Sequence, residues 1–197
     1  MALSLANIRT RVKTHIRAEM ATPAVNDLNN ASIDGWANEH CTDVIRILKD
    51  PVHFSSLIVP DTSITFSSGY ASLPTGYELA LAVKVATTTP TVTKRNCELL
   101  FDPQEFAKRD SSNFILTPDN DHPVVLIANA RAYIKPTALT TGYLDYVKKH
   151  PTITTSQDTL FDSMGDKVLI DLILSSYYGF LEEYELQANH QKLAGVQ

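Results

Sequence analysis

Few side chains of this 197-residue sequence stand in the patterns that catalysis or metal binding requires. His40 precedes Cys41, but neighbouring side chains on a helix point about 100° apart and cannot hydrogen-bond to each other. This pair therefore predicts a partly exposed imidazole beside a buried thiol. Residues 119–121 (Asp-Asn-Asp) resemble the start of a calcium loop, but the later ligands and the central glycine are missing, so we expect a turn.

The remaining candidate motifs are equally incomplete. Glu182, Glu183 and Glu185 could form an acidic site, but consecutive carboxylates on a helix are usually its solvated face. The sequence contains no P-loop, no dinucleotide fingerprint, no CxxC or HExxH pair and no GxSxG turn. We therefore expect no catalytic residues, no cofactor and no metal ion, and we interpret the chain as a non-enzymatic assembly protein.

One charge pattern stands out near the N-terminus. Arg9, Lys13 and Arg17 are spaced by four residues, so on a helix they form a single stripe, which we call the basic stripe. Residues 2–20 hold four basic side chains and one acidic one, whereas residues 156–197 hold two basic and seven acidic ones. The simpler interpretation is a solvated face, paired with the acidic C-terminal helix. The alternative is a surface that faces an acidic partner or the phosphate backbone of DNA.

Composition indicates a soluble globular protein made in a cytoplasm. Apolar residues form 44% of the sequence, and the formal net charge of -5 disfavours tight nucleic-acid binding as the main task. Cys41 and Cys97 lie far apart, which is typical of buried thiols in a reducing compartment. Residues 1–11 lack the apolar core of a secretory signal, and no run of about 18 apolar residues predicts a membrane span.

Hydrophobic periodicity predicts helices at both ends of the chain. They are residues 2–20 with Ser4 as the cap, a second helix from Ser32 to just before Pro51, and a long helix from about residue 163 to a frayed end at 195–197. The long helix is expected to bury a broad apolar face that includes Phe180 and Tyr184. Residues 23–30 are expected to form a loop.

The sequence between these helices is rich in threonine, which favours strands: sixteen of the twenty threonines lie between Thr62 and Thr159. We expect two hairpins, further strands and one short helix capped by Asp102. The first hairpin joins 64–66 to 70–73, and the second joins 124–127 to 131–135. The other strands are 79–85, with 92–101 as its partner, and 143–147. The short helix ends near residue 110. In strand 79–85, the alternating Leu79, Leu81, Val83 and Val85 are expected on one face.

The predicted fold class is α+β. Both chain ends, residues 1–54 and 159–197, form a helical subdomain with two N-terminal helices and one long C-terminal helix. Residues 55–158 form an inserted, antiparallel β-rich subdomain that carries the short helix.

Several pieces of the sequence, taken in order, resemble one known family. They are the opening helix (3–12), the second-helix signature (32–39), a strand followed by Leu-Pro (70–74) and its successor (77–79), the short helix (101–106), the late hairpin (125–136) and the closing helix (167–191). Their order and spacing resemble the head-to-tail adaptor proteins of tailed bacteriophages, also called connector or head-completion proteins. The tail after the last helix, from residue 193, is short, unlike that of members that dock through an extended C-terminal arm.

The resemblance implies a viral structural protein in the neck of the virion, at the head-tail junction. Such proteins form a ring, commonly a dodecamer, beneath the portal protein. The ring extends the channel through which double-stranded DNA passes and docks the tail tube, nozzle or fibres. The resemblance implies no reaction, no cofactor, no membrane and no sequence-specific DNA binding.

Other classes of function stay open. One is a different neck or tail component of the virion. Another is a β module that binds a host or a carbohydrate, because aromatic rings stack on sugars. The tyrosines available for this role are Tyr70, Tyr77, Tyr133, Tyr143 and Tyr146, although strand tyrosines often pair across strands. The last class is an enzyme, which a deep pocket that gathers His53, His122 or His150 with carboxylates would favour.

Overall fold

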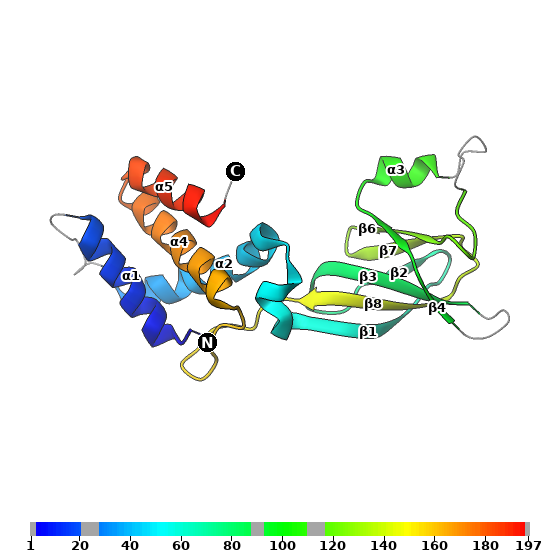
Figure 1. Cartoon of the computed structure of the whole chain (residues 1–197), viewed down its shortest axis with the longest axis horizontal. Helices are drawn as coiled ribbons and strands as arrows, with labels where there is room; N and C mark the ends of the chain where they lie inside the picture. Colours follow the sequence, from blue (N-terminus) through cyan, green and yellow to red (C-terminus); the bar gives the residue numbers. More distant parts are fainter. Residues whose placement is uncertain (1–2, 21–27, 88–92, 110–116, 196–197) are drawn as a thin grey trace. The chain divides into compact units, whose positions relative to one another are not determined.

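The computed structural model describes residues 3–20, 28–87, 93–109 and 117–195. The fold is α+β, as predicted, with helices at both ends of the chain and strands between them (Figure 1). The chain divides into two compact units, which we call the helical unit and the β unit. The helical unit is Met1–Leu57 with His150–Gln197, and the β unit is Ile58–Lys149.

The junctions between the units differ from the expected boundaries at 54/55 and 158/159. The first lies at the end of η2 (Pro51–Leu57), a short 3-10 segment whose Phe54 and Leu57 are fully buried. The second lies earlier than expected because the segment after residue 149 packs on the helices. The Ile153 N–H donates to Asn38 Oδ1 over 2.6 Å, and Asn38 Nδ2 donates to the Ile153 carbonyl over 3.3 Å. Such hydrogen bonds satisfy non-helical backbone and leave no trace in hydrophobic periodicity.

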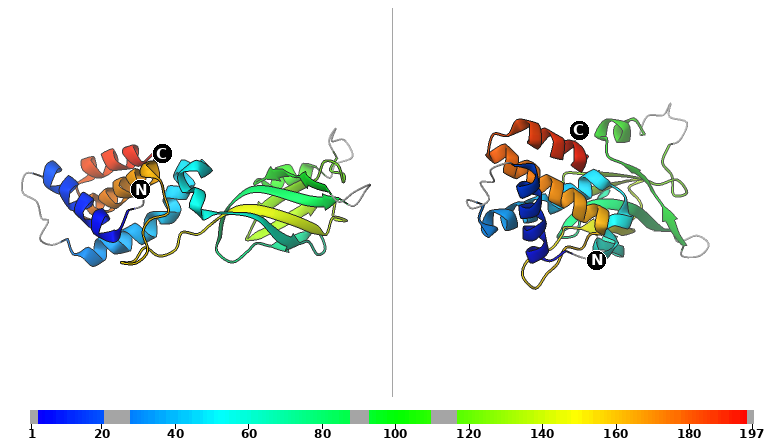
Figure 2. Two further views of the ribbon diagram at one scale, coloured as in Figure 1. Left: turned by 60° about the horizontal axis from the view of Figure 1, so that its bottom comes forward. Right: turned by 60° about the vertical axis from the view of Figure 1, so that its left-hand side comes forward.

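Four α-helices lie in the described part of the helical unit (Figure 2). They are α1 (Leu5–Glu19), α2 (Asn30–Leu48), α4 (Ser163–Phe180) and α5 (Tyr184–Ala194). Ser4 caps α1, as predicted, by accepting a hydrogen bond from the Asn7 N–H. α2 begins earlier than predicted because Asn29, rather than Ser32, is its cap, and the Ser32 N–H donates to Asn29 Oδ1 over 2.8 Å.

α4 is the central helix of this unit. Every residue from Val168 to Ser175 is buried, and α1, α2 and α5 pack against α4. Of the predicted apolar face of α1, Leu5, Ile8, Val12 and Ile16 are buried, whereas its last member, the C-cap residue Met20, is only partly buried. A helix covered on several sides is apolar on most of its circumference, which explains the hydrophobic residues of α4, interrupted in this stretch by the buried Asp171. No helix in the described part of the chain combines the length and the apolar character that a membrane span requires.

The prediction of a single long C-terminal helix is corrected by a break after Phe180. Leu181 caps α4, and the next residue, Glu182, has a positive φ of 60°, which α-helical backbone does not adopt. α5 then packs back on α4. A Cβ atom at Gly179 would lie 2.6 Å from Nε2 of Gln187, so the missing side chain of Gly179 makes room for α5.

Two four-stranded sheets form the β unit. One has the order β1 (Ile58–Thr65), β8 (Thr141–Lys148), β3 (Tyr77–Thr87), β4 (Thr93–Asn96); the other has the order β2 (Tyr70–Ser72), β7 (Arg131–Lys135), β6 (Val124–Ala128), β5 (Glu98–Leu100). Every neighbouring pair is antiparallel, as predicted, except β5 and β6, which run parallel. The expected partner of β3 supplies two strands: β4 pairs with β3, and β5 joins the other sheet.

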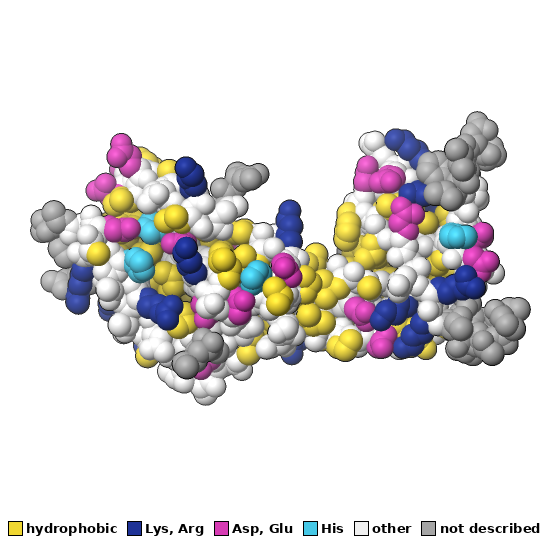
Figure 3. Space-filling model, viewed as in Figure 1, with side chains coloured by type: hydrophobic (Ala, Val, Ile, Leu, Met, Phe, Trp, Pro, Cys, Tyr) yellow, Lys and Arg dark blue, Asp and Glu magenta, His cyan; other side chains and the backbone are white. Residues whose placement is uncertain are grey.

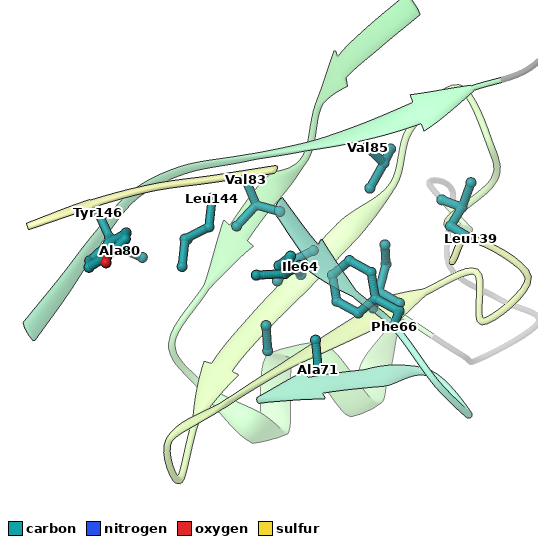
Figure 4. Packing of buried hydrophobic residues seen from close by; sticks show 12 residues of the cluster. Ile64, Phe66, Ala71, Ala80, Val83, Val85, Leu139, Leu144 and Tyr146 are labelled. Carbon is teal, nitrogen blue, oxygen red and sulfur yellow. The ribbon is translucent and has the colours of Figure 1, made fainter. Parts of the chain in front are cut away.

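Both sheets contribute to one apolar core (Figure 4). Its members include Ile64, Val83, Val85 and Leu144 from the first sheet and Ala71, Val125, Ala132 and Ile134 from the second. β6 is buried on both faces, because Val125 joins this core while Val124 and Leu126 pack in a second cluster with Phe106. Phe106 belongs to α3 (Pro103–Lys108), which Asp102 caps as predicted through the Gln104 N–H.

The hairpin predicted for 64–66 with 70–73 is wrong, although its turn exists. Ser67 and Tyr70 exchange two backbone hydrogen bonds of 2.8 and 3.2 Å. The flanking strands nevertheless pair elsewhere, β1 with β8 and β2 with β7, so the chain crosses from one sheet to the other at this turn. The second predicted hairpin, β6 with β7, is confirmed, and Asn129 and Ala130 at its turn both have positive φ.

The alternation predicted for β3 is interrupted. Its register against β8 shifts between Ala80 and Ala82, and such a bulge reverses which side chains face the core. Ala80 and Val83 are therefore buried together, whereas Leu79 and Leu81 are only partly buried. Parts of five predicted segments lie outside the described residues: the start of helix 2–20, loop 23–30, strand 92–101, the end of the short helix near residue 110, and the frayed end at 195–197.

Candidate functional site

The basic stripe splits into two structural settings. Arg9 forms a bidentate ion pair with Asp34 of α2, with Nε to Oδ1 at 2.8 Å and Nη2 to Oδ2 at 2.5 Å. Lys13 donates its Nζ to Asn30 Oδ1 over 2.9 Å. Both side chains therefore bind α2, and Asp34 takes the place of the acidic C-terminal helix as the partner of Arg9.

Arg17, the last member of the basic stripe, is exposed. No ion pair of Arg17 or Lys13 is present within the described residues. The partner of Lys13 is an amide, so its charge is not neutralised there. The stripe thus leaves two positive charges at the C-terminal half of α1 for solvent or for another molecule.

An apolar pocket of about 300 Å³ lies between the start of α2 and the end of α4. Its lining comprises Leu28, Asn29, Ser32, Trp36, Tyr177, Phe180 and Leu181. The rings of Trp36 and Tyr177 meet edge to face at 6.5 Å between centroids. We call this hollow the aromatic pocket. Phe180 is 76% exposed, so its ring stands at the rim and not in the core.

Three carboxylates follow the aromatic pocket along the chain. Glu182 and Glu183 in the turn between α4 and α5, and Glu185 in the first turn of α5, are exposed, as the solvated-face interpretation predicted. Tyr184, between them, is 66% exposed. Acidic and hydrophobic side chains lie side by side over this part of the helical unit (Figure 3). Because the helix breaks here, Phe180 and Tyr184 leave the buried face that the sequence predicted for them.

A second pocket, of about 410 Å³, contains a hydrogen-bonded relay of three side chains. His40 bridges α2 and α4: its Nδ1 lies 3.0 Å from Asp43 Oδ2 and its Nε2 lies 2.7 Å from Ser176 Oγ. The same order of groups activates the nucleophile of serine hydrolases. Sequence spacing missed this relay because 136 positions separate His40 from Ser176.

The setting of Ser176 argues against a nucleophilic role. Ser176 lies near the C-terminus of α4, where the helix dipole places negative partial charge and opposes a developing oxyanion. Interior helical N–H groups are also committed to the backbone ladder. The relay fits a polar clamp between α2 and α4 better than an active site. Cys41, as predicted, is buried and takes no part, and burial raises the pKa of its thiol to about 12.

The three histidines that would favour an enzyme have other roles. His53 Nδ1 lies 2.8 Å from Asp162 Oδ2 at the start of α4. His150 Nε2 accepts from the Leu160 N–H, and its ring packs on Phe161 at 4.8 Å. Neither histidine lines the aromatic pocket or the pocket of the His40 relay.

His122 lines a pocket of about 250 Å³ with Glu98 and Asp121. Both carboxylates are paired with guanidinium groups, Glu98 with Arg109 at 2.5 Å and Asp121 with Arg95 at 2.7 Å. Residues 119–121 form the predicted turn, in which Asp119 Oδ1 accepts two backbone N–H groups. Within the described ranges, no group of three or more His, Cys, Asp or Glu residues could hold a metal ion.

The strand tyrosines contact one another and nearby cations. Tyr70 and Tyr133 are register partners with centroids 6.2 Å apart, and Tyr77 packs on Tyr146 at 6.0 Å. Lys94 Nζ lies 4.0 Å above the ring of Tyr143. These contacts occupy ring faces that a sugar would need.

The chain matches no protein-family model and no curated protein sequence. Sequence reasoning placed the basic stripe on α1 but missed the aromatic pocket. The sequence did contain a signal for the helix break beside this pocket. Gly179 is followed by Glu182 and Glu183, a combination that weakens a continuous helix just where Phe180 becomes exposed.

Proposed function

We propose that this chain is a structural protein of a tailed bacteriophage, the head-to-tail adaptor in the neck of the virion. Copies form a ring, commonly a dodecamer in such proteins, beneath the portal protein. The ring extends the channel for double-stranded DNA and provides a docking surface for the tail tube, nozzle or fibres. The role requires no reaction and no cofactor.

The division of the chain supports this proposal most. Helices from both chain ends build one unit, and a two-sheet β unit is inserted between them. The resemblance of the sequence to head-to-tail adaptors implies this arrangement, including the short helix after Asp102 and the late hairpin around Asn129.

Apolar side chains on the surface of the helical unit give further support. Five large hydrophobic residues are about half exposed or more: Val52, Met164, Phe180, Tyr184 and Leu193. Phe180 and Tyr184 are exposed together at the break between α4 and α5, and exposed apolar groups that gather in one patch are typical of surfaces that other protein chains cover. A ring protein needs surfaces of this kind for its neighbours and for the portal.

The charge distribution suits a conduit for DNA. The net charge of -5 disfavours tight binding, and Lys13 and Arg17 offer a modest positive surface. Each additional phosphate contact would make passage slower and more salt-dependent, so few contacts are an advantage in a channel. Arg9 is committed to Asp34 and contributes structure rather than DNA contact.

The mass of the native assembly tests the proposal. Light scattering is measured on the full chain alone and after mixing with the portal protein of the same genome. We expect a ring-sized mass, either alone or on the portal. A chain that remains monomeric and does not bind the portal would contradict the proposal and favour the host-binding module, for which a glycan titration by NMR is the next step.

The DNA-facing role of the stripe has its own test. Arg17→Glu reverses the exposed charge, and Lys149→Glu reverses an exposed charge of the β unit as a matched control. We expect Arg17→Glu to reduce DNA retention in assembled particles and Lys149→Glu to leave it unchanged. Equal DNA content in both would exclude this role of the stripe without affecting the ring.

A further inference from the structure

The aromatic pocket has the composition of a site for an organic cation. Three aromatic side chains, Trp36, Tyr177 and Phe180, line a hollow of about 300 Å³. Aromatic faces carry negative partial charge and attract guanidinium and ammonium groups within about 6 Å of the ring centre. The pocket volume is at the lower end of ligand sites and accommodates one long side chain.

The charges around the aromatic pocket are asymmetric. Glu182 and Glu183 directly follow the lining residue Leu181, and Glu185 lies in the first turn of α5. None of these three carboxylates forms an ion pair with another described residue. On the α2 side, Lys13 bonds to Asn30, next to the lining residue Asn29. A cation would therefore approach from the α4–α5 turn, where the negative charge is concentrated.

We propose that the aromatic pocket binds an arginine side chain presented by another polypeptide. The aliphatic stem would lie against Leu28 and Leu181, and the guanidinium would stack on the rings of Trp36 and Phe180, because Tyr177 is 2% exposed, while its outer N–H groups face the glutamates. Arginine suits both halves of this site, since its planar cation stacks on rings and pairs with carboxylates. The β unit already uses this contact internally, with Arg131 lying 4.9 Å above the ring of Tyr70.

The pocket also contains its own reporter. Trp36 is the single tryptophan of the chain, so intrinsic fluorescence measures occupancy directly. The probe is N-acetyl-arginine methylamide, titrated into the full chain. The matched control is the citrulline derivative, which has nearly the same shape without the charge. We expect a saturable change with the arginine probe, at millimolar concentrations, and at least about fivefold weaker binding of the citrulline probe.

Two variants locate the binding. Phe180→Ala removes an exposed ring, and the triple change Glu182→Gln, Glu183→Gln, Glu185→Gln removes the charges. We expect each to weaken the arginine probe by about fivefold while circular dichroism stays unchanged. The matched control neutralises three exposed carboxylates elsewhere, Glu39→Gln, Glu105→Gln and Asp158→Asn, and is expected to bind as the parent chain does.

Several outcomes would overturn the proposal. These are no fluorescence change up to about 50 mM probe, equal binding of the citrulline derivative, or tighter binding of choline or of the lysine derivative. The control triple variant would also contradict the proposal if it lost the Trp36 response as the Glu182, Glu183 and Glu185 variant does. Binding of the probe would then depend only on the net charge of the chain. If the parent chain shows a concentration-dependent Trp36 signal that Arg17→Glu abolishes, the arginine comes from a second copy, which supports the site. None of these results depends on ring assembly.

Discussion

Glu19 and His190 are 171 positions apart in the chain, yet Glu19 Oε2 lies 3.0 Å from Nε2 of His190. The other ring nitrogen of His190 lies 3.1 Å from Asp171 Oδ1, and Glu19 also accepts the hydroxyl of Tyr178. His190 is 2% exposed. One buried imidazole thus joins α1, α4 and α5 through two carboxylates.

This network predicts a pH dependence of stability. Burial lowers the pKa of His190, but the hydrogen bonds and charges of Asp171 and Glu19 outweigh burial and raise it above the ordinary value. A raised histidine pKa stabilises the fold fully below the ordinary pKa of about 6.5, and the gain disappears as the pH rises through the folded-state pKa. We expect His190→Gln to lose more stability at pH 6 than at pH 9 in urea denaturation. An equal loss at both pH values would show that His190 is neutral in the folded chain.

Asp166 predicts the opposite kind of effect. Burial raises its pKa to about 6, although the hydrogen bond from Thr159, of 2.7 Å, favours the carboxylate. A carboxyl with a raised pKa binds its proton more tightly in the folded state, so stability falls as the pH rises from about 4 to above 6. We expect Asp166→Asn, which can still accept from Thr159, to stabilise the chain at pH 8 by about 1–2 kcal/mol. The gain should vanish at pH 4, where denaturation of the variant and of the parent chain should coincide.

The basic stripe predicts two different responses to charge reversal. Arg9→Glu places a carboxylate against Asp34, where Arg9 now makes two hydrogen bonds, so the thermal midpoint is expected to fall. Arg17→Glu changes an exposed residue and is expected to leave the midpoint unchanged. Differential scanning calorimetry of both variants checks this contrast, and similar midpoints would mean that the Arg9–Asp34 pair contributes nothing to stability.

Alanine substitutions at two glycines are expected to change the free energy of unfolding in opposite directions. A Cβ at Gly142 would lie 2.6 Å from Cε2 of the buried Phe66 and 3.2 Å from Ile64, so Gly142→Ala is expected to cost about 1–3 kcal/mol. Gly35 lies within α2, and no atom lies within 4 Å of the position that an alanine methyl would take there, so Gly35→Ala is expected to stabilise by about 0.5–1 kcal/mol. Chemical denaturation of both variants gives the two signs, and stabilisation by Gly142→Ala would show that Phe66 moves aside freely.

The sequence predicted best where local chemistry decides the outcome. Ser4 and Asp102 cap helices as expected, and the Asn129 turn joins two paired strands. The sequence predicted poorly where residues distant in the chain decide which strands pair. Nothing local indicates that the Ser67 turn leads from one sheet to the other, since this depends on β8, more than seventy positions along the chain.

The candidate sites show the same division. Four-residue spacing placed Arg9, Lys13 and Arg17 on one helix, but only packing shows that Arg9 belongs to Asp34. The aromatic pocket and the His40–Ser176 relay each combine α2 with α4, whose residues are more than a hundred positions apart. Periodicity describes one helix at a time and does not report which helices meet.

The pairing of β1 with β8 has a consequence for how this chain can change. Ile58 and Val147 are register partners, so the two ends of the β unit leave it from adjacent positions. Partners across antiparallel strands have Cα atoms only about 5 Å apart. A linker of a few glycines could therefore replace the whole sandwich, and a different sandwich with neighbouring ends could be grafted in its place. The β unit can therefore be exchanged as a whole by in-frame recombination at its two ends. The helical unit would keep its own core in such an exchange.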